Sequence, residues 1–448
     1  MQHRTHRRFL TALGAIGLSV LLSTPVSAAE PPVTGAAPAA PDRVAASSAA
    51  GQRTTTEFAF VSRDPAPRDS RASSFAPENR RAGKALPQES AEDMAERVKA
   101  SRKLREGSDE GPSTKRQTPD INVCMENSRT YREYGWTIDH FFHCQGTRQT
   151  LYKRQCRLFW CWNVGSFSFR ATTIGQGYDN QRRIYYGTLL DQIEVRGDVS
   201  GLSMRHEIHC RALGDDPACE AEFGNGRTAP LTDWLRDRGS YHFFRSAHGG
   251  DAPDLKAYYD ITQEFTAIYQ DGRTRSITTG RGGHRCDSAS YIPGRSSACV
   301  FDVVIPVMSS ISIRDPEVRQ TARNIRDAQY RPERTVPAYA AKEVPGAPDS
   351  GQPLTRNYYD RAQQDRSRTR VRAVCQQYWP GYAGRGLECD EYPFASTDQS
   401  AGANPPHQNF VAKAIPAADN GKGGEKINTF YKEDRILDSD PFYVRITS

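Results

Sequence analysis

The chain has 448 residues, of which 60 are Lys or Arg and 53 are Asp or Glu, so its formal net charge is +7. This mild positive charge permits association with nucleic acid or with anionic polymers but does not demand either. Beyond residue 28, no stretch reaches the roughly eighteen apolar residues that a membrane-spanning helix needs. A transmembrane helix is therefore excluded for the rest of the chain.

Residues 1–28 have the pattern of a secretory signal peptide. A basic start precedes an apolar run over 9–22, and Ala28 completes a small-x-small cleavage pattern. The protein is therefore expected to be secreted and extracellular.

Residues 29–118 are predicted to be disordered, as a pro-segment or a linker. Large apolar residues are scarce there, so burial cannot offset the entropy lost on ordering. Residues 90–104 could form a short polar helix within this stretch.

Residues 119–315 are predicted to form a β-rich domain of unknown role. Aromatic and β-branched residues alternate with polar ones, and Asp271-Gly272 lies between two such runs, which is a strong hairpin signal. Many short strands and few helices indicate a β-sandwich or barrel.

All ten cysteines follow the predicted signal peptide, and an even number in an exported chain indicates disulfides. No two of them have the C-x-x-C spacing typical of zinc sites. Local pairing predicts Cys210–Cys219, Cys286–Cys299 and Cys375–Cys389. The sequence does not pair the other four, which are Cys124, Cys144, Cys156 and Cys161.

Residues 316–353 are predicted to be a proline-rich linker, since a short charged helix leads into five prolines that disfavour helix and sheet. Residues 354–448 would be a second folded unit. The predicted fold class is therefore multidomain, with a β-rich, disulfide-stapled middle domain and a small α+β C-terminal domain.

The C-terminal unit carries an acidic pair, Asp390 and Glu391, on a strand-like segment. Adjacent strand residues point to opposite faces, so one acid can act as a general base while the other helps to hold a metal ion. Further along, Asn420 lies in an apparent Asn/Gly turn, and the following helical stretch carries Glu425 and Asn428 three residues apart. Carboxylate and amide oxygens suit a hard cation such as Mg²⁺ or Mn²⁺. Alternatively, Asn420 only shapes the turn.

Six arginines enter this unit between residues 356 and 372. Arginine forks suit phosphate oxygens, so the run predicts either a strip that grips a nucleic-acid backbone or a solvated amphipathic helix. The candidate DNA contacts are Arg370, Arg372, Lys413, Lys422 and Arg435.

These residues resemble the NucA/NucB family of extracellular deoxyribonucleases. The resemblance covers about 375–444 and is strongest over 389–395, 415–420 and 429–444. It implies a secreted endonuclease that cuts DNA with little sequence preference. It also implies a compact ββα-metal-like core, in which the acidic pair replaces the histidine usual in related nuclease folds.

Two other interpretations remain open. The chain could be a secreted polymorphic toxin whose DNase tail is neutralised by an immunity or inhibitor protein, or an envelope or binding protein that has lost activity. A metalloprotease is excluded, because His206 and His209 are three residues apart rather than four.

Overall fold

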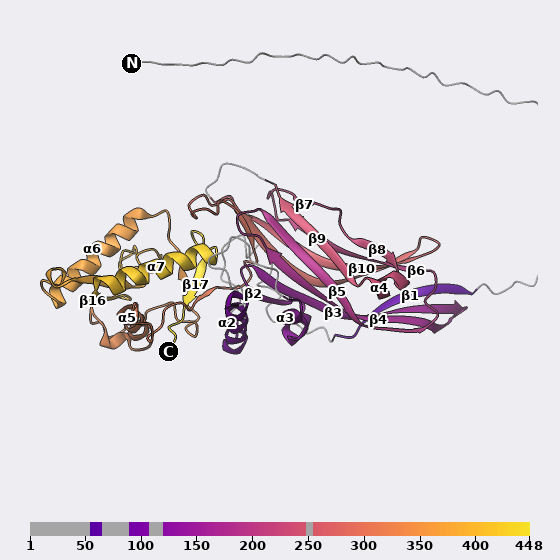
Figure 1. Ribbon diagram of the computed structural model, residues 1–448, viewed down its shortest axis with the longest axis horizontal. Helices are drawn as coiled ribbons and strands as arrows, with labels where there is room; N and C mark the ends of the chain where they lie inside the picture. Colours follow the sequence, from indigo (N-terminus) through magenta and orange to yellow (C-terminus); the bar gives the residue numbers. More distant parts are fainter. Residues whose placement is uncertain (1–53, 65–88, 107–119, 248–253) are drawn as a thin grey trace, which may run out of the picture. The chain divides into compact units, whose positions relative to one another are not determined.

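The computed structural model, drawn in Figure 1, describes residues 54–64, 89–106, 120–247 and 254–448. The predicted signal peptide and most of the predicted disordered stretch lie outside the described residues. None of the described helices is long and apolar enough to cross a membrane.

The β-rich region contains two antiparallel sheets. The larger has the order β1-β3-β4-β5-β9-β7, with β2 also pairing with β3. Its strands are β1 Thr55–Ser62, β2 Trp136–Asp139, β3 Phe142–Arg157, β4 Trp160–Gly177, β5 Arg183–Gly197, β7 Cys219–Ala221 and β9 Gly239–Ser246.

The second sheet has the order β12-β11-β10-β6-β8. Its strands are β6 Leu202–Ala212, β8 Arg227–Pro230, β10 Ala257–Tyr269, β11 Thr274–Asp287 and β12 Ala298–Val300. The hairpin predicted at Asp271-Gly272 is confirmed, since β10 and β11 pair on either side of it and Gly272 has a φ of 83°. The short helices α3 Asn122–Met125 and α4 Leu231–Arg236 accompany the sheets.

Apolar side chains from both sheets form shared clusters. Phe167 and Phe169 of β4, for example, pack in one cluster with Met204 of β6 and Phe265 of β10. Every second residue of β10 from Ala257 to Phe265 is buried, which is the period-two pattern of a strand with one face on a core. The β-rich character predicted for this region is confirmed.

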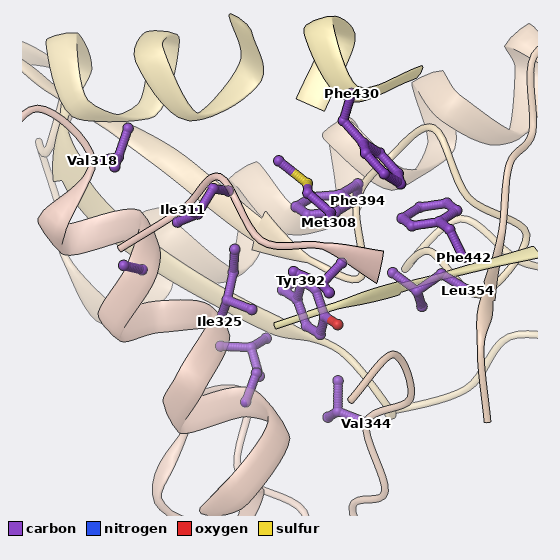
Figure 2. Packing of buried hydrophobic residues seen from close by; sticks show 14 of the residues in the cluster. Met308, Ile311, Val318, Ile325, Val344, Leu354, Tyr392, Phe394, Phe430 and Phe442 are labelled. Atoms are coloured by element: carbon purple, nitrogen blue, oxygen red, sulfur yellow. The ribbon is translucent and has the colours of Figure 1, made fainter. Parts of the chain in front are cut away.

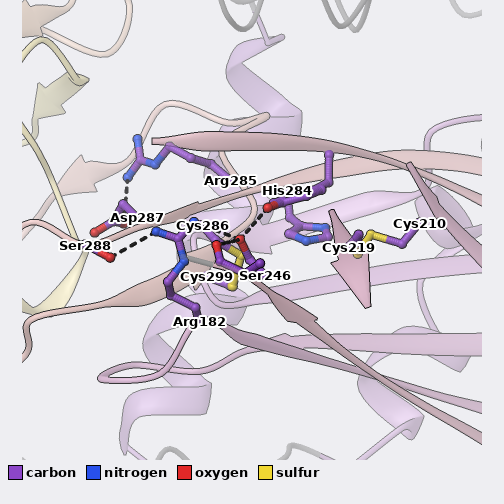
Figure 3. Close-up of a disulfide and its surroundings, with 12 residues drawn as sticks. Arg182, Cys210, Cys219, Ser246, His284, Arg285, Cys286, Asp287, Ser288 and Cys299 are labelled. Atoms are coloured by element: carbon purple, nitrogen blue, oxygen red, sulfur yellow. Dashed lines mark hydrogen bonds and ion pairs between the residues drawn. A yellow bond between two sulfur atoms is a disulfide. The ribbon is translucent and has the colours of Figure 1, made fainter. Parts of the chain in front are cut away.

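Five disulfides hold the described structure together. The three local pairs are those expected, Cys210–Cys219, Cys286–Cys299 and Cys375–Cys389, and the other four cysteines form Cys124–Cys144 and Cys156–Cys161. Figure 3 shows Cys286–Cys299 beside Arg182, whose guanidinium donates to the hydroxyls of Ser288 (3.0 Å) and Ser246 (2.8 Å).

Two segments of the stretch predicted to be disordered are folded. β1 pairs along its whole length with β3, and α2 (Ala91–Glu106) packs on β2. The polar helix expected at 90–104 is therefore present, but it is docked. Asp93 forms ion pairs with Arg129 and Arg132, and Ser101 donates to Asp139 (2.8 Å).

The C-terminal region combines helices with short strands, drawn from brown to yellow in Figure 1. Its strands are β13 Val307–Met308, β14 Leu354–Thr355, β15 Leu387–Tyr392, β16 Val411–Pro416 and β17 Pro441–Val444, and its helices are α5 Arg319–Tyr330, α6 Arg361–Tyr378 and α7 Ala417–Glu433. β17 lies between β13 and β14, and β15 pairs with β16.

The expectation that residues 316–353 are a linker is wrong. Ala322 and Ile325 of α5, together with Val344, are buried in the same cluster as Tyr392 and Phe442 (Figure 2). The same cluster also contains residues that precede the predicted boundary at 315, among them Met308 and Ile311. Proline stops regular structure and so favours a spacer, but irregular backbone can still bury its side chains, as Val344 shows. The limits of separately folding domains stay a prediction.

A buried histidine in the β-rich region makes stability depend on pH. His143 lies inside the sheets, with its Nδ1 2.8 Å from the Thr137 hydroxyl and its ring stacked on Phe301. Burial lowers its pKa to about 4. The unfolded chain therefore takes up the proton first, near pH 6.5, and stability falls from there down to about pH 4.

We expect His143→Gln to remove this loss. Between pH 7.5 and pH 5, the unfolding free energy of the parent should fall by about 2 kcal/mol more than that of the variant. Urea unfolding at both pH values measures the difference. His209→Gln, on an exposed side chain of β6, is the control and should follow the parent. Parallel pH profiles for parent and His143→Gln would contradict the assignment.

Candidate active site

The two acids of the pair are held by different helices. Asp390 and Glu391 lie on β15, so their side chains leave opposite faces of the strand. Asp390 Oδ2 accepts from Nδ2 of Asn324 on α5 (3.0 Å), and Glu391 Oε2 accepts from the Ser367 hydroxyl on α6 (2.8 Å). Each carboxylate is therefore fixed in position by a partner far away in sequence.

Both carboxylates are poorly solvated. Asp390 is buried and Glu391 is half-buried, and the ion pairs between described residues include neither of them. Burial raises the pKa of each to about 7, although the hydrogen bonds from Asn324 and Ser367 act in the opposite direction. Two neighbouring acids that are poorly solvated and form no ion pair with another described residue make a site that favours a cation.

The acidic pair lines a cleft of about 1000 Å³. Helix α6 contributes Arg361, Arg368 and Arg372 to the lining, and helix α7 contributes Asn420, Gly424 and Asn428. The cleft thus has acids in its wall and arginines beside them, an arrangement that can bind a phosphate group next to a bound cation.

The arginines share one face of α6. Arg361, Arg368 and Arg372 are separated by seven and four residues, which matches two turns and one turn of an α-helix. The Asp360 side chain caps the helix by accepting from the backbone N–H of Gln363 (2.8 Å). This face borders the cleft, while Val371 and Cys375 of the same helix pack inward, so α6 is amphipathic and its exposed arginines lie beside the acidic pair.

The expected Asn/Gly turn is instead the first part of a helix. α7 begins at Ala417, so Asn420 and the glycines at 421, 423 and 424 are helical. Gly423 is required by close packing, since a Cβ there would lie 2.9 Å from Thr321 of α5. Asp419 of α7 also caps the first turn of α5, because its carboxylate accepts from the backbone N–H groups of Gln320 and Thr321.

Of the predicted metal ligands, Asn420 and Asn428 border the cleft and Glu425 does not. Glu425 is ion-paired with Lys422 (2.9 Å), with 67% of its side chain exposed. Asn420 Nδ2 donates to Glu388 Oε2 (2.9 Å). Residues 420, 424 and 428 lie on one face of α7, and position 425 lies on a face that points away from the cleft.

The predicted DNA contacts are scattered. Arg372 borders the cleft, whereas Lys413 lies opposite Asp390 on β16 and Lys422 pairs with Glu425. Arg370 points elsewhere, to the carbonyl of Ala401 and the ring of Phe410.

The assignment of Arg435 is wrong. Its side chain is completely buried and ion-paired with Asp287 of the β-rich region (2.5 Å). It therefore has no surface to offer a nucleic acid.

Four residues of this site were not among the predicted site residues. Arg361 and Arg368 could have been found from the helix spacing that they share with Arg372. Ser367 and Asn324 carried no usable signal, because their roles depend on contacts across 24 and 66 residues of chain.

The β-rich region forms part of the cleft wall. Tyr291, Ile292 and Pro293, from the loop closed by Cys286–Cys299, line it. The ring of Tyr291 stacks on Tyr358 with their centroids 3.7 Å apart, and its hydroxyl accepts from the backbone N–H of Asp438 (2.7 Å). The cleft is therefore complete only when both regions are present.

Three other groups of possible metal ligands occur among the described residues, and none includes the acidic pair. Two of them consist largely of cysteines that are in disulfides, and the third is Glu207, His209 and Glu264. At the cleft, the donors are the oxygens of Asp390, Glu391, Asn420 and Asn428. These are the oxygen ligands that Mg²⁺ and Mn²⁺ prefer, so the residues fit a hard divalent cation.

Comparison with curated proteins and with solved structures gives no match. The family comparison does give one, and it falls on the part of the chain that carries the acidic pair, α6 and α7. Residues 347–445 match the family model of deoxyribonuclease NucA/NucB.

Proposed function

We propose that the protein is an exported, metal-dependent endonuclease that hydrolyses DNA phosphodiester bonds with little sequence preference. One observation carries the proposal: two carboxylates without ion-pair partners among the described residues border the same cleft as Arg361, Arg368 and Arg372. The match of 347–445 to a deoxyribonuclease family supports DNA as the substrate.

In this proposal, Glu391 is the general base. It is more exposed to the cleft than Asp390, and the Ser367 hydroxyl orients its carboxylate. Glu391 takes a proton from a water molecule as the water oxygen bonds to phosphorus and the bond from phosphorus to the leaving oxygen breaks. The arginines of α6 bind the nonbridging oxygens of the phosphate and of its neighbours along the strand.

Asp390, Asn420 and Asn428 are the residues proposed to hold Mg²⁺ or Mn²⁺. When bound, such an ion would stabilise charge on the phosphate oxygens and on the leaving group. We also propose that β15, β16 and α7, which follow one another along the chain, form the ββα-metal-like unit that the family resemblance implies.

Export is proposed from the N-terminal pattern and is supported by the disulfides. Five disulfides with no free cysteine among the described residues are compatible with an oxidising compartment.

The test is a plasmid-nicking assay on the purified, oxidised mature chain. The whole mature chain is needed because α5 supplies Asn324 and the β-rich region supplies part of the cleft wall. We expect supercoiled DNA to become relaxed and then fragmented with Mg²⁺ or Mn²⁺, and EDTA to stop the reaction. DNA left intact with both ions would contradict the proposal and favour an inactive binding protein. Cleavage that continues in EDTA would contradict metal dependence.

A further inference from the structure

The β3–β4 hairpin ends in an unusual turn, at residues that the nuclease site does not use. Arg157 pairs with Trp160 across the hairpin, so Leu158 and Phe159 form a two-residue turn. The Cys156–Cys161 disulfide closes the hairpin immediately behind them. We call Leu158, Phe159, Trp160 and Trp162 the apolar tip.

The apolar tip is highly exposed. Phe159 is 96% exposed, Trp160 80% and Leu158 69%, and Trp162 on the following strand is 46% exposed. A side chain exposed to this degree touches almost nothing, so the tip projects from the described structure. Large apolar side chains gathered at one exposed point are uncommon on proteins and mark interaction sites.

The turn is also poorly suited to its own backbone. Two-residue hairpin turns favour Asn-Gly or similar pairs, because their backbone requires positive φ angles. Here Leu158 takes a φ of 55°, a conformation that bulky residues rarely adopt. Neither turn geometry nor solubility therefore explains a Leu-Phe pair at this position. Local rules broken together in this way indicate a functional site.

Two arginines lie close to the apolar tip. Arg157 is exposed at the base of the turn, and Arg154 donates to the Asn163 side chain on the neighbouring strand. The nearby Lys153 and Arg196 are paired with Asp198 and Glu194. Arg154 and Arg157 thus lie beside the tip, and Glu57 of β1 lies opposite Arg154.

We propose that the apolar tip inserts into the interface of a lipid bilayer that contains anionic lipids. Tryptophan prefers the boundary between headgroups and acyl chains, and arginine next to an apolar group is attracted to anionic headgroups. A projecting point suits a bilayer better than a protein partner, since protein hot spots lie within a surrounding surface that excludes water. The disulfide holds the tip in one conformation, so little ordering entropy is lost on insertion.

The test is vesicle flotation of the purified mature chain in EDTA, with vesicles of phosphatidylcholine and phosphatidylglycerol. EDTA keeps the readout independent of the proposed nuclease activity. We expect the parent to float with the vesicles and its tryptophan emission to shift to shorter wavelength. The double variant Phe159→Ser/Trp160→Ser should bind at least tenfold more weakly.

The matched control is Phe223→Ser/Tyr241→Ser, which removes two other exposed aromatic side chains of the β-rich region (78% and 69% exposed). It should bind vesicles as the parent does. The proposal is overturned if the parent does not float, or if both double variants lose binding equally. It is also overturned if light scattering shows that the parent is a dimer which the tip variant dissociates, because the tip would then serve self-association.

Discussion

Glu391→Gln is expected to lower the rate of plasmid cleavage by roughly 10²- to 10⁴-fold, the usual contribution of a general base. Glutamine has the shape of glutamate, and its Oε1 can still accept the hydrogen bond from Ser367, but it cannot take a proton from water. The fold should be unharmed. Replacing a poorly solvated carboxylate by a neutral amide removes a desolvation cost, so the melting temperature should stay the same or rise. Initial rates of plasmid relaxation, measured together with thermal unfolding, provide the check.

Asp390→Asn is expected to cause a loss of similar size for a different reason. Asparagine keeps an oxygen that can accept from Asn324, but it removes the charge proposed to hold the cation. Raising the concentration of Mn²⁺ should therefore recover part of the activity in Asp390→Asn and none in Glu391→Gln.

The control for both is Glu343→Gln, which makes the same chemical change on an exposed side chain that does not line the cleft. It should cleave at the parental rate. Near-normal rates in both Asp390→Asn and Glu391→Gln would remove the acidic pair from the mechanism.

Much of this site could be predicted because its information is local. Asp390 and Glu391 are adjacent, so strand alternation alone predicts that they leave opposite faces, as they do. The run of arginines predicts a basic α6, and helical spacing adds that 361, 368 and 372 share one face while 370 lies on another. Arg370 accordingly contacts the carbonyl of Ala401 and the ring of Phe410 instead of the cleft.

The predictions that were wrong concern residues whose contacts join segments far apart in the sequence. Asn324 reaches Asp390 from a stretch whose prolines suggested a spacer, and local sequence does not encode what a segment packs against. Likewise, Gly421, Gly423 and Gly424 suggested a turn by their intrinsic preference. Tertiary packing decides otherwise, because α7 must pass close to Thr321 of α5, and a glycine permits that approach.

Arg435 shows most clearly how tertiary context can overturn an interpretation from sequence. Its guanidinium donates to Asp287 Oδ1 (2.5 Å) and to the carbonyl of Arg295, and neither Arg435 nor Asp287 is exposed. A second buried contact lies alongside, where Arg285 donates to Asp440 (2.8 and 2.9 Å). Although burial opposes its ionisation, Arg285 and Lys256 hold the pKa of Asp440 below its usual value. These contacts join β11 to the segment just before β17, so they fasten the β-rich region to the C-terminal region.

Arg435→Met is therefore expected to lower the free energy of unfolding by about 3–5 kcal/mol, because it leaves Asp287 charged and buried without its main partner. Chemical denaturation of the mature chain measures the loss. Adding Asp287→Asn to Arg435→Met should restore at least half of the lost stability, since the buried unpaired charge is then gone.

Arg372→Met is the matched control: the side chain of Arg372 is exposed, so stability should change by less than about 0.5 kcal/mol. In DNA cleavage the two variants should rank the other way. Arg372→Met should raise the KM for DNA, and the folded fraction of Arg435→Met should keep the parental KM. The opposite result would be an Arg435→Met variant that unfolds at the same denaturant concentration as the parent but binds DNA more weakly. Arg435 would then contact DNA, and other contacts would join the two regions.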